Sequence, residues 1–142
     1  MRDIQARPSL RRSINGVLVL AGWVALVGCG DGKIARYPVS GTVLVDGKPA
    51  DGAMVILCPP ESAVELKNVR PVGTTDAGGK FSMTTFDKGD GAPAGEYKVI
   101  VQWPKGEVDL LKGRYFKLAN STLAATVKEE SNELPPFELT TR

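Results

Sequence analysis

Short runs in which apolar and polar residues alternate fill the chain from residue 37 onward, and Gly, Pro and Asp separate the runs. Residues 39–45 and 96–103 show the alternation most clearly. A period of two is that of a half-buried β-strand, because successive side chains of a strand point to opposite faces. No convincing run of apolar residues has the period of 3.6 that an amphipathic helix needs. The pattern therefore predicts an all-β body.

Turn-forming residues divide this body into about seven strands. The sequence Asp-Gly-Lys-Pro at residues 46–49 predicts a turn after the first strand, and Pro59 ends the second. Residues 76–79 predict the turn of a hairpin between the third and fourth strands. Strands of this number and spacing favour a two-layer antiparallel sandwich. The predicted strands cover residues 39–45, 53–58, 72–75, 80–85, 96–103, 123–127 and 137–139.

The N-terminal 28 residues have the pattern of an export signal. Four arginines and one aspartate make the start of the chain basic, and residues 17–27 are then apolar apart from the small Gly22. At about 1.5 Å per residue, a helix of this length reaches roughly half of a ~30 Å hydrocarbon core. The apolar run is therefore too short for a transmembrane helix. The pair of arginines at residues 11–12 leaves a twin-arginine route open as an alternative.

Leu26, Val27, Gly28 and Cys29 close the apolar run, and their order is that of a lipobox, at which bacterial signal peptidase II cuts before the cysteine. The small Gly28 suits a peptidase that needs a narrow residue at the cut, and the Cys29 thiol can form a thioether to diacylglycerol. We therefore expect Cys29 to be lipidated and to hold the protein at the membrane, because two or more acyl chains make attachment stable. The alternative is an ordinary secretory signal in which Cys29 is incidental.

This cut predicts a lipoprotein signal peptide at residues 1–28, a flexible tether at 29–36 and a β-domain at 37–142. Residues 29–142 contain 14 basic and 15 acidic side chains, so the formal charge of +2 on the whole chain is a property of the leader. A balanced domain without a basic patch argues against nucleic acid as a partner.

The sequence contains no histidine. This absence excludes the Ser-His-Asp and Cys-His nucleophile systems and the usual zinc ligands. Cys58 is the second of only two cysteines, and without a histidine to activate its thiol we expect it to fill space as a small hydrophobe. The sequence therefore predicts a protein that is not an enzyme, with no catalytic residue, no cofactor and no metal ligand.

Two loops that combine aspartate with glycine are the candidates for calcium binding. One contains Asp76 and the other contains Asp87 and Asp90. Neither has the dense acidic spacing with which a single loop wraps a calcium ion. We expect these carboxylates to accept hydrogen bonds from nearby backbone amides in turns, and weak calcium binding is the alternative.

The strand at residues 53–58 carries apolar side chains on both faces. If Val55 and Leu57 face the core, then Met54, Ile56 and Cys58 point outward. Three outward apolar side chains could form a docking surface. The alternative is that a loop covers them, because long connections often pack over sheets.

Aromatic residues near the end of the fifth predicted strand are candidates for a carbohydrate platform. They are Trp103, Tyr115 and Phe116. We expect Trp103 in the core instead, because it continues the face of Tyr97. The long connections, at residues 59–71 and 104–122, are the expected location of any binding function.

Three glycine-bearing segments resemble, in the same order, those of transthyretin-like domains, which are also called carboxypeptidase regulatory-like domains. They are residues 37–53 (YPVSGTVLVDGKPADGA), 73–81 (GTTDAGGKF) and 91–99 (GAPAGEYKV). Together with the lipobox, they make the chain similar to the small transthyretin-like lipoproteins of bacteria. The resemblance implies a prealbumin-like, seven-stranded Greek-key β-sandwich that serves as an accessory, adhesive or scaffolding module. It carries over no catalytic residue.

Hydroxyisourate hydrolase, an enzyme related to transthyretin, needs histidines and ends in Tyr-Arg-Gly-Ser. This chain has no histidine and ends in Leu-Thr-Thr-Arg, which excludes that activity.

We therefore expect an extracytoplasmic, non-catalytic binding or scaffolding module that lipid on Cys29 holds at the bacterial cell membrane. The preferred partner is an unknown envelope protein, and a glycan or the cell wall is the alternative. Gly30 stands where some bacteria place a retention aspartate, which favours the outer membrane. A third hypothesis, a hydrolase that uses only carboxylates, needs two acidic groups held together in a cleft.

Overall fold

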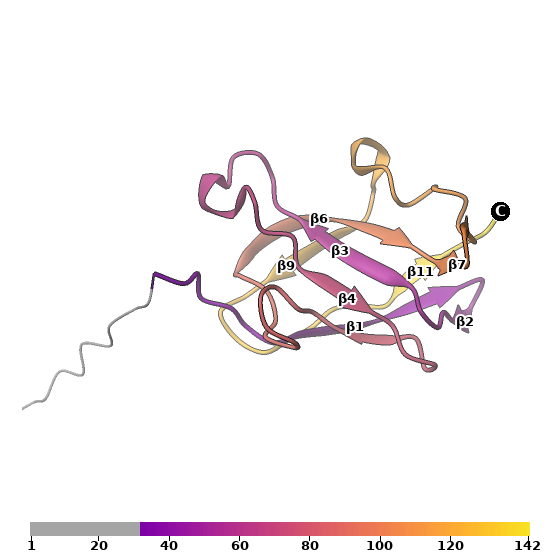
Figure 1. The fold of residues 1–142 in the computed structure, drawn as a ribbon, viewed down its shortest axis with the longest axis horizontal. Helices are drawn as coiled ribbons and strands as arrows, with labels where there is room; N and C mark the ends of the chain where they lie inside the picture. The colour runs from indigo at the N-terminus through magenta and orange to yellow at the C-terminus, as the bar shows by residue number, and fades with distance from the viewer. Residues whose placement is uncertain (1–31) are drawn as a thin grey trace, which may run out of the picture. The chain divides into compact units, whose positions relative to one another are not determined.

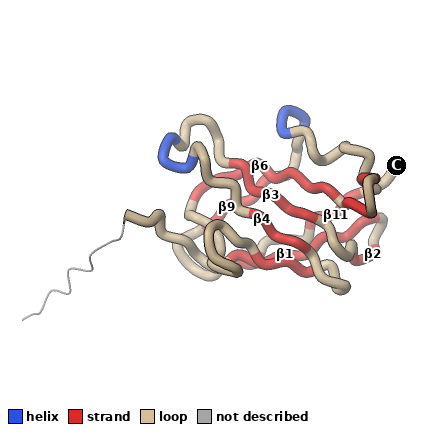
Figure 2. Tube along the Cα trace, viewed as in Figure 1, coloured by secondary structure: helices blue, strands red, loops and turns tan. Residues whose placement is uncertain are grey.

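The computed structural model describes residues 32–142, so the predicted lipobox and the lipidation site Cys29 lie outside the described residues. Over the described range the protein is all-β, with two short 3-10 helices (Figures 1 and 2). Within this range no helix is long and apolar enough to cross a membrane. The strands are β1 (Val39–Val45), β2 (Lys48–Pro49), β3 (Met54–Cys58), β4 (Val72–Thr74), β5 (Lys80–Ser82), β6 (Gly95–Gln102), β7 (Pro104–Lys105), β8 (Val108–Asp109), β9 (Ala124–Val127), β10 (Asn132–Glu133) and β11 (Phe137–Leu139), and the helices are η1 (Val64–Leu66) and η2 (Leu118–Asn120).

Strand β1 is the centre of the first sheet. It pairs in antiparallel orientation with β2 and β5, and in parallel orientation with β10 and β11. The parallel register places Val43 opposite Phe137 and Ser40 opposite Glu133. The start of the described body is therefore hydrogen-bonded to its end.

The second sheet has four strands in the order β4-β3-β6-β9, and all of its pairs are antiparallel. Its longest pairing joins β3 to β6, where Val55 lies opposite Val101 and Cys58 lies opposite Lys98. Strands β7 and β8 form a separate hairpin that follows β6 directly. Figure 1 shows this hairpin near the C-terminus, at the end of the body far from the indigo segment that precedes β1.

One hydrophobic core takes side chains from both sheets, which gives the body its sandwich character. Val43 of β1, Val55 of β3 and Val99 of β6 are all fully buried in it. Gly41 of β1 leaves room for the ring of Phe81, because a β-carbon at that position would lie 2.5 Å from the Phe81 Cζ atom. The Phe81 ring stacks on Phe137 with 6.2 Å between the ring centroids.

The seven strands predicted from the alternation are all present. The bounds of β1 are those predicted, and its buried face carries Val39, Gly41, Val43 and Val45 as expected. The four strands that the pattern missed, namely β2, β7, β8 and β10, have two residues each. Such short strands contain too few positions to show a period of two.

Two predictions about strand pairing were wrong. The predicted hairpin at residues 72–85 does turn at residues 76–79, but β4 joins the second sheet and β5 joins the first. An isolated bridge between Val72 and Thr84 and a hydrogen bond from the Asp76 N–H to the Lys80 carbonyl (2.8 Å) are what remain of the expected pairing. The sandwich is also not wholly antiparallel, because β10 and β11 run parallel to β1. Turn residues predict where the chain reverses direction, but they do not predict which sheet the strand on each side of the turn will join.

A close backbone crossing fixes the entry to β1. Tyr37 and Ala92 exchange backbone hydrogen bonds of 2.9 and 3.0 Å between N–H and carbonyl groups. Gly91 has a φ of +86°, and a β-carbon there would lie 1.8 Å from the carbonyl oxygen of Tyr37. A side chain at residue 91 therefore cannot coexist with this crossing.

We expect Gly91→Ala to lower the free energy of unfolding by roughly 3–5 kcal/mol, because it adds a backbone clash to the strain of a positive φ. The matched control is Gly89→Ala in the same loop, where φ is +73° and the β-carbon meets no atom within 4 Å. That variant should lose only about 1–2 kcal/mol. Chemical denaturation of the two variants measures the difference, and equal losses would contradict the close crossing.

Candidate functional site

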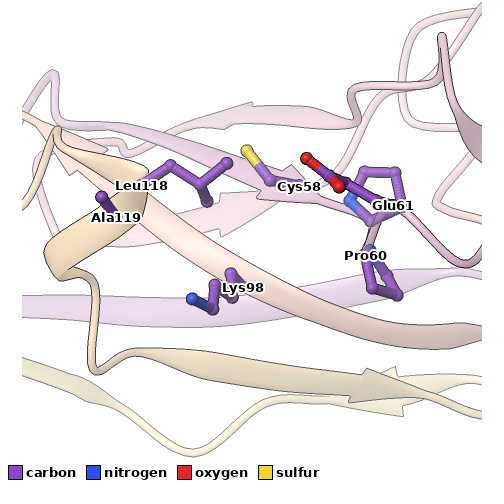
Figure 3. A pocket seen from close by; sticks show the side chains of 7 residues that line it. Cys58, Pro60, Glu61, Lys98, Leu118 and Ala119 are labelled. Atoms are coloured by element: carbon purple, nitrogen blue, oxygen red, sulfur yellow. The ribbon is translucent and has the colours of Figure 1, made fainter.

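A pocket of about 580 Å³ opens on the outward face of the second sheet. Figure 3 shows its lining from close by: the Cys58 thiol and the Leu118 side chain lie within it, and Lys98 lies at one side. The lining residues come from the sheet and from both long connections, and they are Cys58, Pro59, Pro60, Glu61, Lys98, Leu118 and Ala119.

The floor of the pocket is placed by the alternation of β3 and β6. Leu57 and Val99 point inward and are fully buried in the core, so their neighbours Cys58 and Lys98 point outward. These two residues lie directly opposite each other in the antiparallel pairing. One pairing of the sheet therefore places both residues on the outward face, where they line the pocket.

The first wall is the connection from β3 to β4, which begins at Pro59. Two apolar residues of this connection, Leu66 in η1 and Val69, are buried in the core. A hydrogen bond of 2.9 Å from the Leu57 N–H to the Pro71 carbonyl closes the loop at its base. The prolines and Glu61 are thus presented by a loop that is anchored at both ends.

The second wall belongs to the connection from β8 to β9. Asp109 organises its start: one carboxylate accepts hydrogen bonds from the backbone N–H groups of Trp103 (2.9 Å), Leu111 (3.1 Å) and Gly113 (2.7 Å). Burial would raise the pKa of Asp109, but these three donors outweigh it and hold the pKa below its usual value. Leu111, on the same turn, is buried in the core. The sequence reasoning missed this role of Asp109, although aspartate is a residue that favours such turns.

The same connection then runs along the edge of β6 beyond the end of β9. The Val101 N–H donates to the Tyr115 carbonyl (3.0 Å) and the Val99 N–H donates to the Leu123 carbonyl (2.9 Å). The Ser121 hydroxyl donates to the Val99 carbonyl. These bonds position η2, so that the half-exposed Leu118 reaches over the outward face of the sheet.

The outward face of β3 is therefore covered in part. Cys58 is only 4% exposed, whereas Met54 and Ile56 are half-buried. Burial raises the pKa of the Cys58 thiol, and the charge of Arg70 opposes this rise only in part. An open docking face made of Met54, Ile56 and Cys58 is inconsistent with this burial. The hypothesis that part of the connection at residues 104–122 covers the face agrees with the position of Leu118.

One aspartate of each acidic loop accepts backbone hydrogen bonds, as the turn hypothesis predicts. Asp76 accepts hydrogen bonds from the N–H groups of Gly78 (2.9 Å) and Lys80 (3.0 Å). Asp90 accepts hydrogen bonds from three backbone N–H groups of its own loop. Among residues 32–142, no three acidic, cysteine or histidine side chains gather in a way that could hold a metal ion.

The three candidate aromatic residues do not form one exposed platform. Trp103 is half-buried against the core, and its indole N–H donates to the Asp51 carbonyl (2.7 Å). Tyr115 also packs against the core, and its hydroxyl accepts a hydrogen bond from the Thr140 N–H (3.1 Å). Phe116 is the member of the three that is exposed.

The lining of the pocket suits an apolar group. Its walls are proline, leucine and alanine, and its two charged residues have opposite signs. A raised pKa keeps the Cys58 thiol protonated at neutral pH, which makes it a poor nucleophile. The arrangement therefore fits the binding of an apolar group with polar flanks.

In a Cys29→Ser variant, Cys58 is the only thiol, and we expect it to react with an aromatic disulfide reagent at pH 8 roughly tenfold more slowly than a free thiol. Burial and the raised pKa both cause this protection. Leu118→Ala should accelerate the reaction by removing the cover, and Val108→Ala, an exposed apolar position in the hairpin, should leave it unchanged. A rate equal to that of a free thiol in the parent would contradict the covered face.

No family model and no curated protein matches the chain. A crystal structure of a DUF3823 family protein from Parabacteroides merdae is similar, with a TM-score of 0.42 and 13% sequence identity. The match covers 72% of this chain and 45% of that one, so the chain spans less than half the length of that protein.

Proposed function

We propose that the protein is a lipid-anchored, extracytoplasmic module that binds or scaffolds another protein of the cell envelope and catalyses no reaction. We further propose that its β-sandwich has the prealbumin-like, seven-stranded Greek-key topology of transthyretin-like domains. The lipid on Cys29 anchors the domain in a bacterial membrane, and Gly30 favours the outer membrane.

One observation carries the anchoring part of this proposal: a cysteine closes an eleven-residue apolar run that follows a basic N-terminus. Leu26, Val27 and Gly28 precede this cysteine in the order that a lipobox requires. An export signal of this kind removes the first 28 residues and leaves Cys29 as the new N-terminus.

The pocket supports protein binding. The two connections that were expected to carry function contribute opposite walls of one apolar pocket, although they lie far apart in the sequence. Glu61 and Lys98 add opposite charges to its lining, which would orient a partner chain while an apolar side chain fills the space between them. A hydrophobic centre with a polar rim is the usual anatomy of a protein interface.

The alternative of a glycan-binding module has weaker support. Stacking against sugar rings needs exposed aromatic faces, but Trp103 and Tyr115 are half-buried and hydrogen-bonded. Phe116 is left as an exposed aromatic residue in this region.

Cells given a clickable fatty acid should label the wild-type protein, and Cys29→Ser should abolish the label and keep the leader uncut. The physical reason is that the thioether and the acyl chains both depend on this thiol. The matched control is Cys58→Ser, which should leave the label unchanged because Cys58 is buried. A labelled Cys29→Ser variant would contradict the anchor.

A photo-crosslinking residue at Ala119, on the wall of the pocket, should give one discrete protein adduct in intact cells. The same residue at Glu107, which is exposed in the β7–β8 hairpin of the same connection, should not. Leu118→Ser should lower the adduct yield at position 119 at least severalfold by removing an apolar contact. Equal adducts at both positions, together with retention on purified envelope polysaccharide that is lost in Phe116→Ala, would favour the glycan alternative.

A further inference from the structure

The described chain begins with a strap, residues 32–36, that lies against the loop formed by residues 84–91. In Figure 1 the strap is the indigo segment that leads into β1, and it enters at the end of the body opposite the β7–β8 hairpin. Gly32, Ile34, Arg36 and Phe86 line one shallow pocket between strap and loop. Ile34 and Arg36 are half-buried, whereas the other strap residues are exposed, so the strap packs on the domain through these two side chains.

Asp90 gives the loop its shape. One carboxylate oxygen accepts a hydrogen bond from the Thr85 N–H (2.7 Å), and the other accepts from Phe86 (3.1 Å) and Asp87 (3.0 Å). Burial would raise the pKa of Asp90, but these donors and the charge of Arg36 outweigh it and lower the pKa. The loop is thus a fixed platform.

Arg36 ties the strap to this platform. Its Nε atom lies 2.8 Å from a carboxylate oxygen of Asp90, and its guanidinium carbon lies 5.2 Å from the centre of the Phe86 ring. The same guanidinium donates to the Ile34 carbonyl (2.9 Å), and Ile34 packs against the core. An ion pair, a cation–π contact and an apolar contact therefore hold residues 34–36 against the domain.

The platform presents an apolar ring with basic neighbours to solvent. Phe86 is 59% exposed. Lys88 follows it by two residues in the loop, Lys33 lines the same shallow pocket, and both lysines are exposed. Arg36 neutralises Asp90, which leaves Asp87 as the acidic group of this loop outside the ion pair. Aromatic and basic side chains together are what the interfacial region of a lipid bilayer accommodates.

Chain length then limits how far this surface can lie from a lipid on Cys29. Ile34, the first strap residue that packs on the domain, comes five residues after Cys29, and at 3.3–3.6 Å per residue this distance is at most about 18 Å. If the strap were free, the first fixed residue would be Tyr37, and eight residues could span roughly 28 Å. The contacts of Ile34 and Arg36 therefore shorten the reach of the anchor by about a third.

We infer that the strap and the Phe86 loop form a membrane-facing surface, which seats on the phospholipid headgroups and orients the domain with its β7–β8 hairpin away from the bilayer. This inference rests on the proposed lipidation of Cys29. The lipid brings the surface within reach of the headgroups, and the Phe86 ring then enters the interfacial layer while the lysines contact phosphate. The domain is held in one orientation instead of swinging on a free tether.

The test uses the mature lipidated protein in phosphatidylcholine vesicles whose acyl chains carry bromine near the headgroups, because bromine quenches nearby tryptophan. Trp103 is the single tryptophan of residues 29–142, so Trp103→Phe combined with Phe86→Trp leaves one probe on the loop. The matched control combines Trp103→Phe with Val108→Trp, since Val108 is 62% exposed at the hairpin. Both variants lose the same indole hydrogen bond.

We expect the probe at position 86 to lose roughly half of its emission on brominated vesicles, and the probe at 108 to lose almost none. Adding Arg36→Gln to the loop probe should reduce the quenching at least twofold, because the freed strap lets the loop leave the surface. Equal quenching at positions 86 and 108, or quenching that Arg36→Gln does not change, would overturn the inference and leave the anchor intact. Mass spectrometry of the N-terminal peptide separates the two, since an unmodified Cys29 would overturn the anchor as well.

Discussion

The body depends on the pairing of β1 with strands from the far end of the chain. Val43 lies opposite Phe137 and Ser40 lies opposite Glu133, so more than 90 residues are closed into a loop by this contact. Closing such a loop costs entropy before any contact offsets it, although the cost grows only slowly with length. Burial offsets this cost: β1 contributes Val39, Val43 and Val45 to the core, and Phe137 of β11 stacks on Phe81 of β5 in the same sheet.

The same pairing fixes the place where the chain enters the domain. β1 is hydrogen-bonded along both edges, which holds the residues just before it in place. Tyr37 is also joined to Ala92 by two backbone hydrogen bonds. Gly91 allows this crossing, since no side chain would fit against the Tyr37 carbonyl. The Asp90 carboxylate that receives Arg36 is the next residue back along the loop. The pairing of β1 therefore determines where the strap lies, through the three consecutive residues Asp90, Gly91 and Ala92.

The sequence predicts what depends on local period and turn chemistry. Residues 39–45 alternate strictly, and β1 has those bounds. Asp76 and Asp90 each have a glycine within two residues, and both accept hydrogen bonds from backbone amides as such turns require. The parallel pairing of β10 could not be predicted from the sequence, because its two residues, Asn132 and Glu133, are too few to show an alternation and neither is β-branched.

The candidate site was harder to predict than the fold because it is made by tertiary contact. Cys58 and Lys98 belong to strands about forty residues apart, and neither residue type marks a site by itself. Leu118 comes over them only because β6 extends beyond β9 and hydrogen-bonds the connection from Tyr115 to Leu123. Sequence reasoning could name the two long connections as the place for function, but not their meeting at one pocket.

The apolar character of both faces of β3 explains why such a pocket exists at all. Inward residues such as Val55 fill the core, so the outward Ile56, half-buried opposite Ile100 of β6, must be covered by something other than the opposing sheet. The connection that carries η2 covers this face at Cys58. The cover is incomplete, as the 41% exposure of Leu118 shows. An apolar surface that the chain covers only in part has a residual free energy to gain from burial. A partner that completed the cover would bind for the same physical reason that the connection packs there.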